Sequence, residues 1–546
     1  MNTYLKLMIP AFILQCITLS GQQKSAQDSI IKINQVEVIK EFEVTLEESK
    51  KVDIVPALIK SEIQKHQYNY EVSIIPVDLN YPSPEIRPLA MDPDEPFSVN
   101  RGFLFAGYGN LKNPSVNAGY RFSKKEKYNL LLRAGYDALD NSEKLAFQQY
   151  SDLKTGIEGD YLLKENMKIF GSVHINRQNR YFFQTRLGVD TLYDKAESLR
   201  KINDIGIQAG IFNPERTETS LNYKVGLMLQ SVRFSDQDIA SSKAGLTFAI
   251  QKQRSKSTQW NIEGIAELRS VNANPDQNIS HVQIKPYLTF NFSKARLTAG
   301  LNAFFDRNNT SPWPEAELLI SLSANQIQAF TGTTQRFYTN DPINQFGLNP
   351  FLNVRIDELV NNVYKDIYAG VKGELSFIAY QVTGGYKISK DHGFFISDST
   401  DFRRFSQVRD NMDIVYLSGN VDFSVTENWT LGGVLTQNFY KTKTLDKAWH
   451  LPNFESNVYM LFNALNNKLK LRGELFIMDQ VNFITIEGVA DKSNFRFDLN
   501  TKAEFYPIKN AGIYLNVINL LNNKFERWYG YPNVGIHMNA GISVIF

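Results

Sequence analysis

The last ten residues of the chain alternate between apolar and polar side chains and end on an aromatic one. One side of an extended strand here would hold Met538, Ala540, Ile542, Val544 and Phe546, and the other His537, Asn539, Gly541 and Ser543. A strand of about ten residues with one apolar face has the length and polarity needed to cross a bilayer within a closed barrel. The terminus therefore predicts a strand of an outer-membrane barrel.

The same period-two pattern recurs upstream, with charged side chains on the second face. Two such segments, 469–477 and 495–505, place seven charges opposite the apolar positions: Lys470, Arg472, Glu474, Arg496, Asp498, Lys502 and Glu504. A helix cannot use this pattern, because alternation with period two scatters apolar groups around its circumference. In a barrel whose apolar side faces lipid, these seven charges are predicted to face the lumen.

A soluble β-sandwich also has alternating strands, with one face on the core and one in water. Sandwich strands usually run about five or six residues, whereas the alternating segments here run ten or more and recur about every twenty residues. The sequence therefore predicts an all-β fold: a large antiparallel transmembrane β-barrel with a short extended N-terminal arm.

The number of strands follows from a count of the alternating segments. Twenty-three candidates begin near Gly102, Val116, Leu130, Lys154, Ile169, Ile205, Leu221, Ala244, Trp260, Val282, Leu297, Ala316, Ile367, Tyr380, Phe394, Ile414, Trp429, Asn457, Leu469, Ile484, Phe495, Ile513 and Met538. Single-chain bacterial barrels have even strand counts, so at least one candidate is wrong or one strand is missing. We predict about 22 strands, with even counts from sixteen to twenty-four open.

Composition agrees with a barrel in a membrane. The chain of 546 residues holds 37 Phe, 26 Tyr and 5 Trp, which suits the aromatic girdles that anchor a barrel at both interfaces. Lys and Arg number 59 against 57 Asp and Glu, for a net charge of +2. No basic field points to nucleic acid as a partner. The partner expected from composition is outer-membrane lipid.

The N-terminal hundred residues differ in character from the rest. Residues 1–21 have the layout of a secretory signal peptide, with one positive charge, an apolar stretch and small residues at its end. Residues 22–96 become rich in proline and are predicted to form an extended periplasmic or lumenal arm, or an unstructured linker. Residues 97–546 are predicted to be the outer-membrane β-barrel. The only cysteine, Cys16, lies in the signal segment, so the mature chain would lack thiol chemistry.

Residues typical of catalysis or metal binding are scattered. The six histidines are widely separated and show no short metal-ligand spacing. Asp391, His392 and Asp341 lie in candidate loops, but adjacency in sequence does not place two side chains on one substrate. We therefore expect no enzyme activity, no cofactor and no metal site.

The C-terminal region resembles that of TonB-dependent receptors, particularly those of Bacteroidota. The resemblance rests on Asn519, Leu520, Leu521, Asn522 and Lys524, then on Tyr529, Gly530 and Pro532, and on the terminal Phe546. The segment 349–352, Asn-Pro-Phe-Leu, is similar to a second element of that family. The resemblance implies a large barrel and uptake of a ligand across the outer membrane. In that family a plug domain precedes the barrel, and residues 22–96 are too few for a full plug, which argues against coupling to TonB.

Two functional hypotheses follow. The first is transport, with segments 182–202, 307–315, 334–365 and 390–412 as extracellular loops. Aromatic residues in these segments are candidate ligand contacts, although aromatics near a bilayer are more often anchors: Tyr193, Trp313, Phe337, Tyr338, Phe346, Phe351, Phe394, Phe395, Phe402 and Phe405. The second is a plugless structural or accessory subunit of an outer-membrane assembly. That reading adds a periplasmic or lumen-filling protein as a candidate partner.

Overall fold

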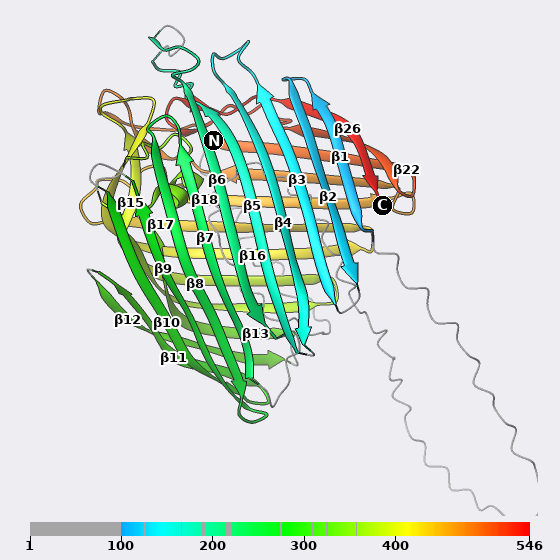
Figure 1. Cartoon of the computed structure of the whole chain (residues 1–546), viewed down its shortest axis with the longest axis vertical. Helices are drawn as coiled ribbons and strands as arrows, with labels where there is room; N and C mark the ends of the chain where they lie inside the picture. The colour runs from blue at the N-terminus through cyan, green and yellow to red at the C-terminus, as the bar shows by residue number, and fades with distance from the viewer. Residues whose placement is uncertain are drawn as a thin grey trace, which may run out of the picture. The chain divides into compact units, whose positions relative to one another are not determined.

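The described part of the chain forms one large barrel of antiparallel strands (Figure 1). The computed structural model describes residues 100–124, 127–164, 166–187, 192–213, 221–272, 276–307, 309–323, 326–355 and 358–546. The predictions for the signal peptide and the arm lie outside these ranges. No helix within them has both the length and the hydrophobicity to span a bilayer.

The sheet contains 22 strands. They are β1 (Gly102–Gly109), β2 (Asn113–Lys124), β3 (Tyr128–Asp140), β4 (Gln149–Lys164), β5 (Met167–Tyr181), β6 (Leu199–Phe212), β7 (Leu221–Phe234), β8 (Ile239–Gln253), β9 (Thr258–Val271), β10 (Gln277–Asn291), β11 (Ala295–Asp306), β12 (Thr310–Ser323), β13 (Ile327–Thr339), β14 (Asn361–Leu375), β15 (Ile378–Ser397), β16 (Phe405–Thr426), β17 (Trp429–Thr442), β18 (Phe454–Ala464), β19 (Leu469–Met478), β22 (Arg496–Ile508), β23 (Ala511–Ile518) and β26 (His537–Ile545). Smaller elements lie in the loops: α3 (Pro342–Leu348), and two hairpins formed by β20 (Asn482–Ile484) with β21 (Ala490–Lys492) and β24 (Glu526–Trp528) with β25 (Tyr531–Pro532).

The first and last strands close the ring. β1 pairs with β26 from Phe103, opposite Ile545, to Gly109, opposite Asn539. Gly541 faces Gly107 in this seam, and a Cβ on Gly541 would lie 2.1 Å from the carbonyl oxygen of Ala106. Closure leaves no strand edge unpaired, which a sheet exposed to hydrocarbon requires because no water is available there to satisfy the backbone.

The wall has an apolar exterior and a polar interior, the reverse of a soluble protein. On β9, Glu267 and Arg269 are 5 % and 6 % exposed, whereas Leu268 between them is 64 % exposed. On β7, Leu227 and Leu229 are 61 % and 59 % exposed. Alternate positions of one strand therefore lie on opposite faces, with the leucines outward. The predicted fold class is confirmed.

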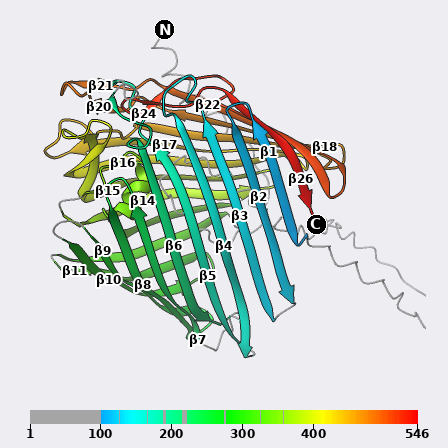
Figure 2. The same cartoon turned by 45° about the horizontal axis from the view of Figure 1, so that its top comes forward.

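The two ends of the barrel differ. The hairpins that follow even-numbered strands such as β2, β8 and β16 are short, and the chain enters and leaves at the same end, where the Arg101 and Gly102 amides both donate to the Phe546 carbonyl at 2.6 Å. The opposite end carries long connections, including 182–198, 340–360, 443–453, 479–495 and 519–536. Figure 2 shows β20, β21 and β24 at this second end. We call the two ends the turn end and the loop end. Long loops are typical of the extracellular side of such barrels.

The predicted count of 22 is confirmed, although two of the candidate strands are wrong and one strand of the barrel is absent from the prediction. Phe394 lies inside β15 rather than opening a strand, and Ile484 belongs to the loop hairpin β20–β21. β13 was missed, because Ala329, Thr331 and Thr333 leave only a weakly apolar face. The predicted loops 307–315 and 390–412 are also mostly strand, since β12, β15 and β16 cover them. β15 and β16 run 20 and 22 residues, about twice the length that crosses a bilayer.

Candidate functional site at the loop end of the barrel

Side chains from nearly opposite walls meet at the loop end. Arg200, the second residue of β6, donates to the Asp236 carboxylate in the β7–β8 loop at 2.8 and 2.9 Å. Arg404, directly before β16, donates to the same carboxylate at 2.5 Å. β6 and β16 are ten strand-to-strand steps apart in one direction around the ring and twelve in the other. Asp236 therefore joins parts of the wall that lie far apart.

This ion pair network continues along the β15–β16 loop. Arg404 also donates to Asp401 at 2.8 Å, and Arg403 donates to Asp401 at 2.9 Å. Burial raises the pKa of Asp236, but Arg200 and Arg404 outweigh it and hold that pKa below its usual value. The side chains of Arg200 and Asp236 are 0 % and 3 % exposed. We call Arg200, Asp236, Asp401, Arg403 and Arg404 the ionic latch.

Aromatic rings surround the latch. The Arg200 and Arg404 guanidinium carbons each lie 4.8 Å from the centre of the Phe182 ring. The rings of Phe351 and Tyr531 stack with centroids 3.5 Å apart and an interplanar angle of 14°. These rings belong to a buried cluster that also includes Ile202, Val232, Phe234, Phe346, Leu352, Phe395, Phe405, Phe483, Trp528 and Tyr529. The cluster draws on four loop-end connections and on the ends of β6, β7, β15 and β16, so it holds the loops against one another and against the wall. We call it the aromatic cap.

A second buried ion pair supports the helix under the cap. Arg269 of β9 pairs with Glu267 at 2.7 Å and with Asp341. Asp341 is the N-cap of α3 and accepts the Asn344 amide at 3.0 Å. Burial raises the pKa of Asp341, and the Arg269 charge opposes this effect. Asp341 therefore positions a helix. No group of three or more His, Cys, Asp or Glu side chains in the described part of the chain is arranged to hold a metal ion.

The family-like C-terminal residues hold the β23–β26 loop in place. Asn519 is 0 % exposed with φ +52°, and its side chain bonds the backbone of Asn523 in both directions at 3.0 Å. The Asn522 side chain accepts the Ile536 amide at 3.0 Å, while Leu520 and Leu521 are exposed. Lys524 offers its carbonyl oxygen to Asn494 at 3.4 Å.

The second half of the motif joins this loop to loops on the far side of the seam. Gln184 donates to the Tyr529 carbonyl at 2.9 Å, and the Thr185 amide donates to Gly530 at 2.9 Å. Gln148 donates to the Pro532 carbonyl at 2.9 Å. Gly530 has φ +77°, and a Cβ there would lie 1.5 Å from the Gln184 side chain. Only glycine fits this position without moving the loop.

The seven predicted lumenal charges lie on two neighbouring strands, β19 and β22, and six of them pair along these strands. Arg496 donates to Asp498 at 2.9 Å, and the side chains of Arg472 and Glu474 and of Lys502 and Glu504 also pair. Lys470 lies 5.4 Å from the Tyr506 ring. Asp498 is 2 % exposed, while Phe497 beside it is 40 % exposed, so the two side chains lie on opposite faces of β22. That the seven charges face the lumen stays a prediction.

Several solved structures with a similar fold are described as an iron transporter or as receptors for ferric siderophores. The FrpB iron transporter from Neisseria meningitidis (F3-3 variant) is 9 % identical, with 82 % of each chain covered and a TM-score of 0.64. A mutant of the ferric enterobactin receptor PfeA from Pseudomonas aeruginosa is 9 % identical over 82 % of this chain and 80 % of that chain, with a TM-score of 0.61. The ferripyoverdine receptor of the outer membrane of Pseudomonas aeruginosa is 9 % identical over 83 % and 72 %, with a TM-score of 0.59.

The chain has the fold of outer-membrane iron receptors. This likeness and the apolar exterior together place the protein in the outer membrane. No protein-family model matches the chain, and no curated protein matches it in sequence. At 9 % identity the receptor fold is what the likeness establishes.

The ionic latch is the part of this receptor fold that sequence reasoning missed. Arg200 and Asp236 are 36 residues apart, and Arg404 is a further 168 residues away, so no local spacing connects them. One signal was present: adjacent arginines, Arg403 and Arg404, stand between two phenylalanines. The segment 349–352, noted for its family likeness, does enter the site, where the Pro350 carbonyl accepts from Arg200 at 3.2 Å.

The predicted ligand-contact aromatics lie in three settings: the cap, the strands, which include Phe394 of β15, and the loops, where Phe402 is exposed. Phe346, Phe351, Phe395 and Phe405 are buried in the cap, where they are unavailable to a ligand in this arrangement. Trp313, Phe337 and Tyr338 lie on β12 and β13. Tyr193 remains partly exposed and lies 3.7 Å from the Arg403 guanidinium carbon.

Proposed function

We propose that the protein admits a ligand across the outer membrane, and that the ionic latch and aromatic cap form the closed extracellular mouth of the receptor. The observation that carries this proposal is the pairing of Arg200 and Arg404 on Asp236, because it ties distant walls of the ring together. A buried ion pair is a poor source of stability, since the desolvation of both charges offsets their attraction. Such a pair is better suited to a contact that can open and close, with the charges paired in one state and solvated in the other.

The chemistry of the mouth indicates what kind of ligand it would meet. The latch brings three arginines together with two aspartates, next to Tyr193 and the rings of the cap. Guanidinium groups beside aromatic faces suit an anionic ligand with planar groups. Neighbours of the same fold are named for iron and for ferric siderophores. We propose anionic ferric chelates as the first ligand class to test.

In this proposal, residues 1–21 act as the signal peptide, residues 22–96 as a periplasmic or lumenal arm, and residues 97–546 as the barrel. The C-terminal motif supports descent from TonB-dependent receptors of the Bacteroidota type, and the short arm argues against TonB coupling. The charges on β19 and β22 line a hydrated lumen. The protein acts as a receptor rather than as an enzyme.

The test is uptake by cells that lack the gene, complemented with variants of the full chain. Iron-limited cells are given radiolabelled ferric chelates of different charge, and uptake is followed with time. We expect loss of one chelate class in the deletion strain and its return with the wild-type gene. We expect Arg404→Ala to abolish selectivity, because it removes one side of the latch.

Arg409→Ala is the matched control, because Arg409 lies five residues further on and pairs with Glu358 at 3.0 Å in an exposed position. It should restore uptake as well as wild type does. The transport proposal is wrong if the deletion strain takes up every chelate normally but becomes permeable to detergents and large antibiotics in every growth medium. A structural subunit would then be the better description.

A further inference from the structure

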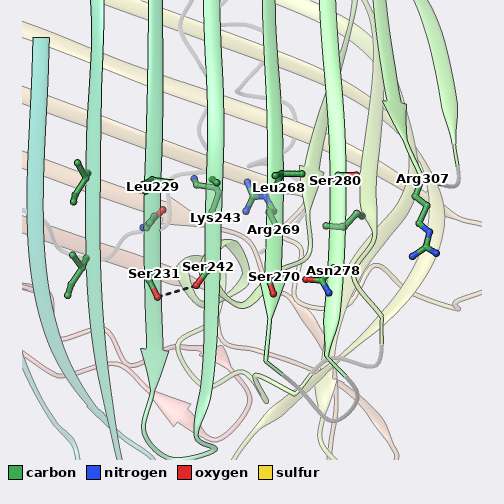
Figure 3. Close-up of a pocket in the computed structure, with 15 residues that line it drawn as sticks. Leu229, Ser231, Ser242, Lys243, Leu268, Arg269, Ser270, Asn278, Ser280 and Arg307 are labelled. Atoms are coloured by element: carbon green, nitrogen blue, oxygen red, sulfur yellow. Dashed lines mark hydrogen bonds between the residues drawn. The ribbon is translucent and has the colours of Figure 1, made fainter. Parts of the chain in front are cut away.

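The outer wall carries a shallow depression at the loop end of β7 to β10, with a volume of about 780 Å³. Ser231, Ser242, Ser270 and Asn278 form one row across it, each in register with the next (Figure 3). All four are exposed, and the Ser231 and Ser242 hydroxyl oxygens are 3.3 Å apart. Small polar side chains here leave the backbone accessible where neighbouring strands carry bulkier groups.

An apolar row borders the depression on its membrane side. Ile207, Leu229, Ala244 and Leu268 are in register across β6 to β9. Ile207, Leu229 and Leu268 are 49 %, 59 % and 64 % exposed. These side chains point outward from the barrel, as lipid-facing residues do. Ile205 of β6, in register with Ser231, extends the apolar border beside the serine row.

A cationic row borders the depression on its loop side. Arg177, Asn203 and Arg233 are in register on β5, β6 and β7, and all three are exposed. Arg307 lines the depression from the β11–β12 loop. Two exposed carboxylates lie near this edge: Asp238, which pairs with Arg233 at 2.7 Å with both side chains mostly exposed, and Asp276, two residues before Asn278. Three arginines against two aspartates leave a net positive edge.

The same sector interrupts the aromatic girdle. At the loop end, exposed aromatic side chains occur elsewhere on the wall: Tyr108 of β1, Phe305 of β11, Phe439 of β17 and Phe497 of β22. The loop halves of β6 to β10, which the structure describes in full, present none outward. Aromatic rings normally occupy this level as anchors. Their replacement by serine, with arginines above and leucines below, suggests that something else fills the space.

We propose that this depression binds a phosphorylated glycolipid of the outer leaflet. Its acyl chains would lie along Ile207, Leu229 and Leu268, and its phosphate groups would meet Arg177, Arg233 and Arg307. Sugar hydroxyls would bond with the serine row. The three rows match the three parts of such a lipid in order, from hydrocarbon to headgroup. A partner protein would not require the cations to stand directly above the hydrocarbon boundary.

The test uses the full chain in nanodiscs, with bisphosphorylated lipid A as the probe and the same lipid without phosphates as its counterpart. Binding is measured by titration and checked by native mass spectrometry. Each cation near an anionic headgroup contributes about 1 kcal/mol, so Arg177→Ala with Arg233→Ala should weaken binding about 30-fold. Ser242→Trp, which fills the depression without changing charge, should also weaken it.

Lys441→Ala is the matched control, since Lys441 is exposed at a similar level on β17, two residues beyond Phe439. Its affinity should stay close to that of wild type. Equal binding of both lipids, or equal binding by wild type and the double arginine variant, would overturn the proposal. So would a dimer of the chain that Ser242→Trp abolishes, because the depression would then be a contact between two copies. Heat-modified gel mobility verifies that each variant has folded.

Discussion

The turn end and the loop end of the barrel are built by different kinds of interaction. At the turn end, outside the closing seam at Phe546, local chemistry suffices. Leu465, Asn466 and Asn467 take positive φ in the turn between β18 and β19, and the Lys468 amide bonds back to Leu465 at 3.2 Å. At the loop end, the ionic latch and aromatic cap join residues hundreds of positions apart. The hairpins of one end are fixed by neighbours in sequence, and the loops of the other by charges and rings that meet only in the folded chain. We expect the loop end to open on its own while the barrel stays closed.

The largest effect is expected from Asp236→Asn, which tests whether the buried charges of the latch depend on one another. This change leaves Arg200 and Arg404 without their shared carboxylate, and breaking a buried pair from one side costs about 3–5 kcal/mol. The loop end should open, as measured by protease cleavage of the loops in intact outer membranes. Asp238→Asn, two residues away in the same loop, removes an exposed pair and should change little, about 0–1 kcal/mol. Equal cleavage of the two variants would contradict the latch.

A second large effect is expected from Gly530→Ala. The new Cβ would meet the Gln184 side chain and would also hold a strained φ, which alone costs about 1–3 kcal/mol. Gly488→Ala separates the two causes, because Gly488 has φ +79° with nothing within 4 Å of a Cβ. We expect Gly530→Ala to expose Trp528 to fluorescence quenchers and Gly488→Ala to leave it protected. Similar quenching in both variants would show that the contact with Gln184 does not hold the loop.

Acid should loosen the loop end before it affects the turn end. Burial lowers the pKa of His450 to about 3 from its usual 6.5 or so, so the unfolded loop binds a proton that the folded one does not. Below about pH 6.5 the cap should therefore lose about 1.4 kcal/mol per pH unit until the folded pKa is reached. Asp236 and Asp401 act in the same direction at lower pH, because their lowered pKa values mean that stability is lost as they protonate.

The measurement for this pH dependence is tryptophan fluorescence between pH 7 and 4, since the His450 ring lies 4.9 Å from Trp528. His450→Phe removes the titrating group and keeps a ring beside Trp528. Its fluorescence should stay constant down to about pH 5, where the carboxylates are still ionised. A wild-type signal that shows no change over the whole range would mean that His450 is solvated.

The smallest effect is expected at the turn end. Asn466→Val places a β-branched residue at φ +54° and should destabilise the hairpin by about 1–2 kcal/mol. Urea unfolding of the barrel would register this loss, whereas protease cleavage of the loops should stay at the wild-type level. Increased loop cleavage in this variant would show that the two ends are coupled, and would contradict the claim that the loop end opens independently of the turn end.

The same contrast explains what the sequence could predict. Alternation over ten residues is a local signal, so most strands, the outward apolar face and the class of barrel were readable. β13 gives no such signal, because its outward positions are mostly small or hydroxyl-bearing. Phe394 resembles the start of a new strand because β15 is about twice as long as a strand that crosses a bilayer. The C-terminal motif was found by its resemblance, but its contacts with Gln148 and Gln184 cross the closing seam and have no sequence signal. Arg200 and Asp236 read as ordinary loop charges until the fold buries them.

The central claim, that loops from distant walls close the extracellular mouth, is tested most directly by thiol labelling on intact cells. Ser198→Cys places a small thiol at a position that is 0 % exposed beside the latch, and Lys195→Cys places one in the exposed part of the same loop. With a membrane-impermeant maleimide, we expect Lys195→Cys to react rapidly and Ser198→Cys to react only when Asp236→Asn is also present. If Ser198→Cys reacts as fast as Lys195→Cys in the otherwise unchanged protein, the mouth is open and the account is wrong.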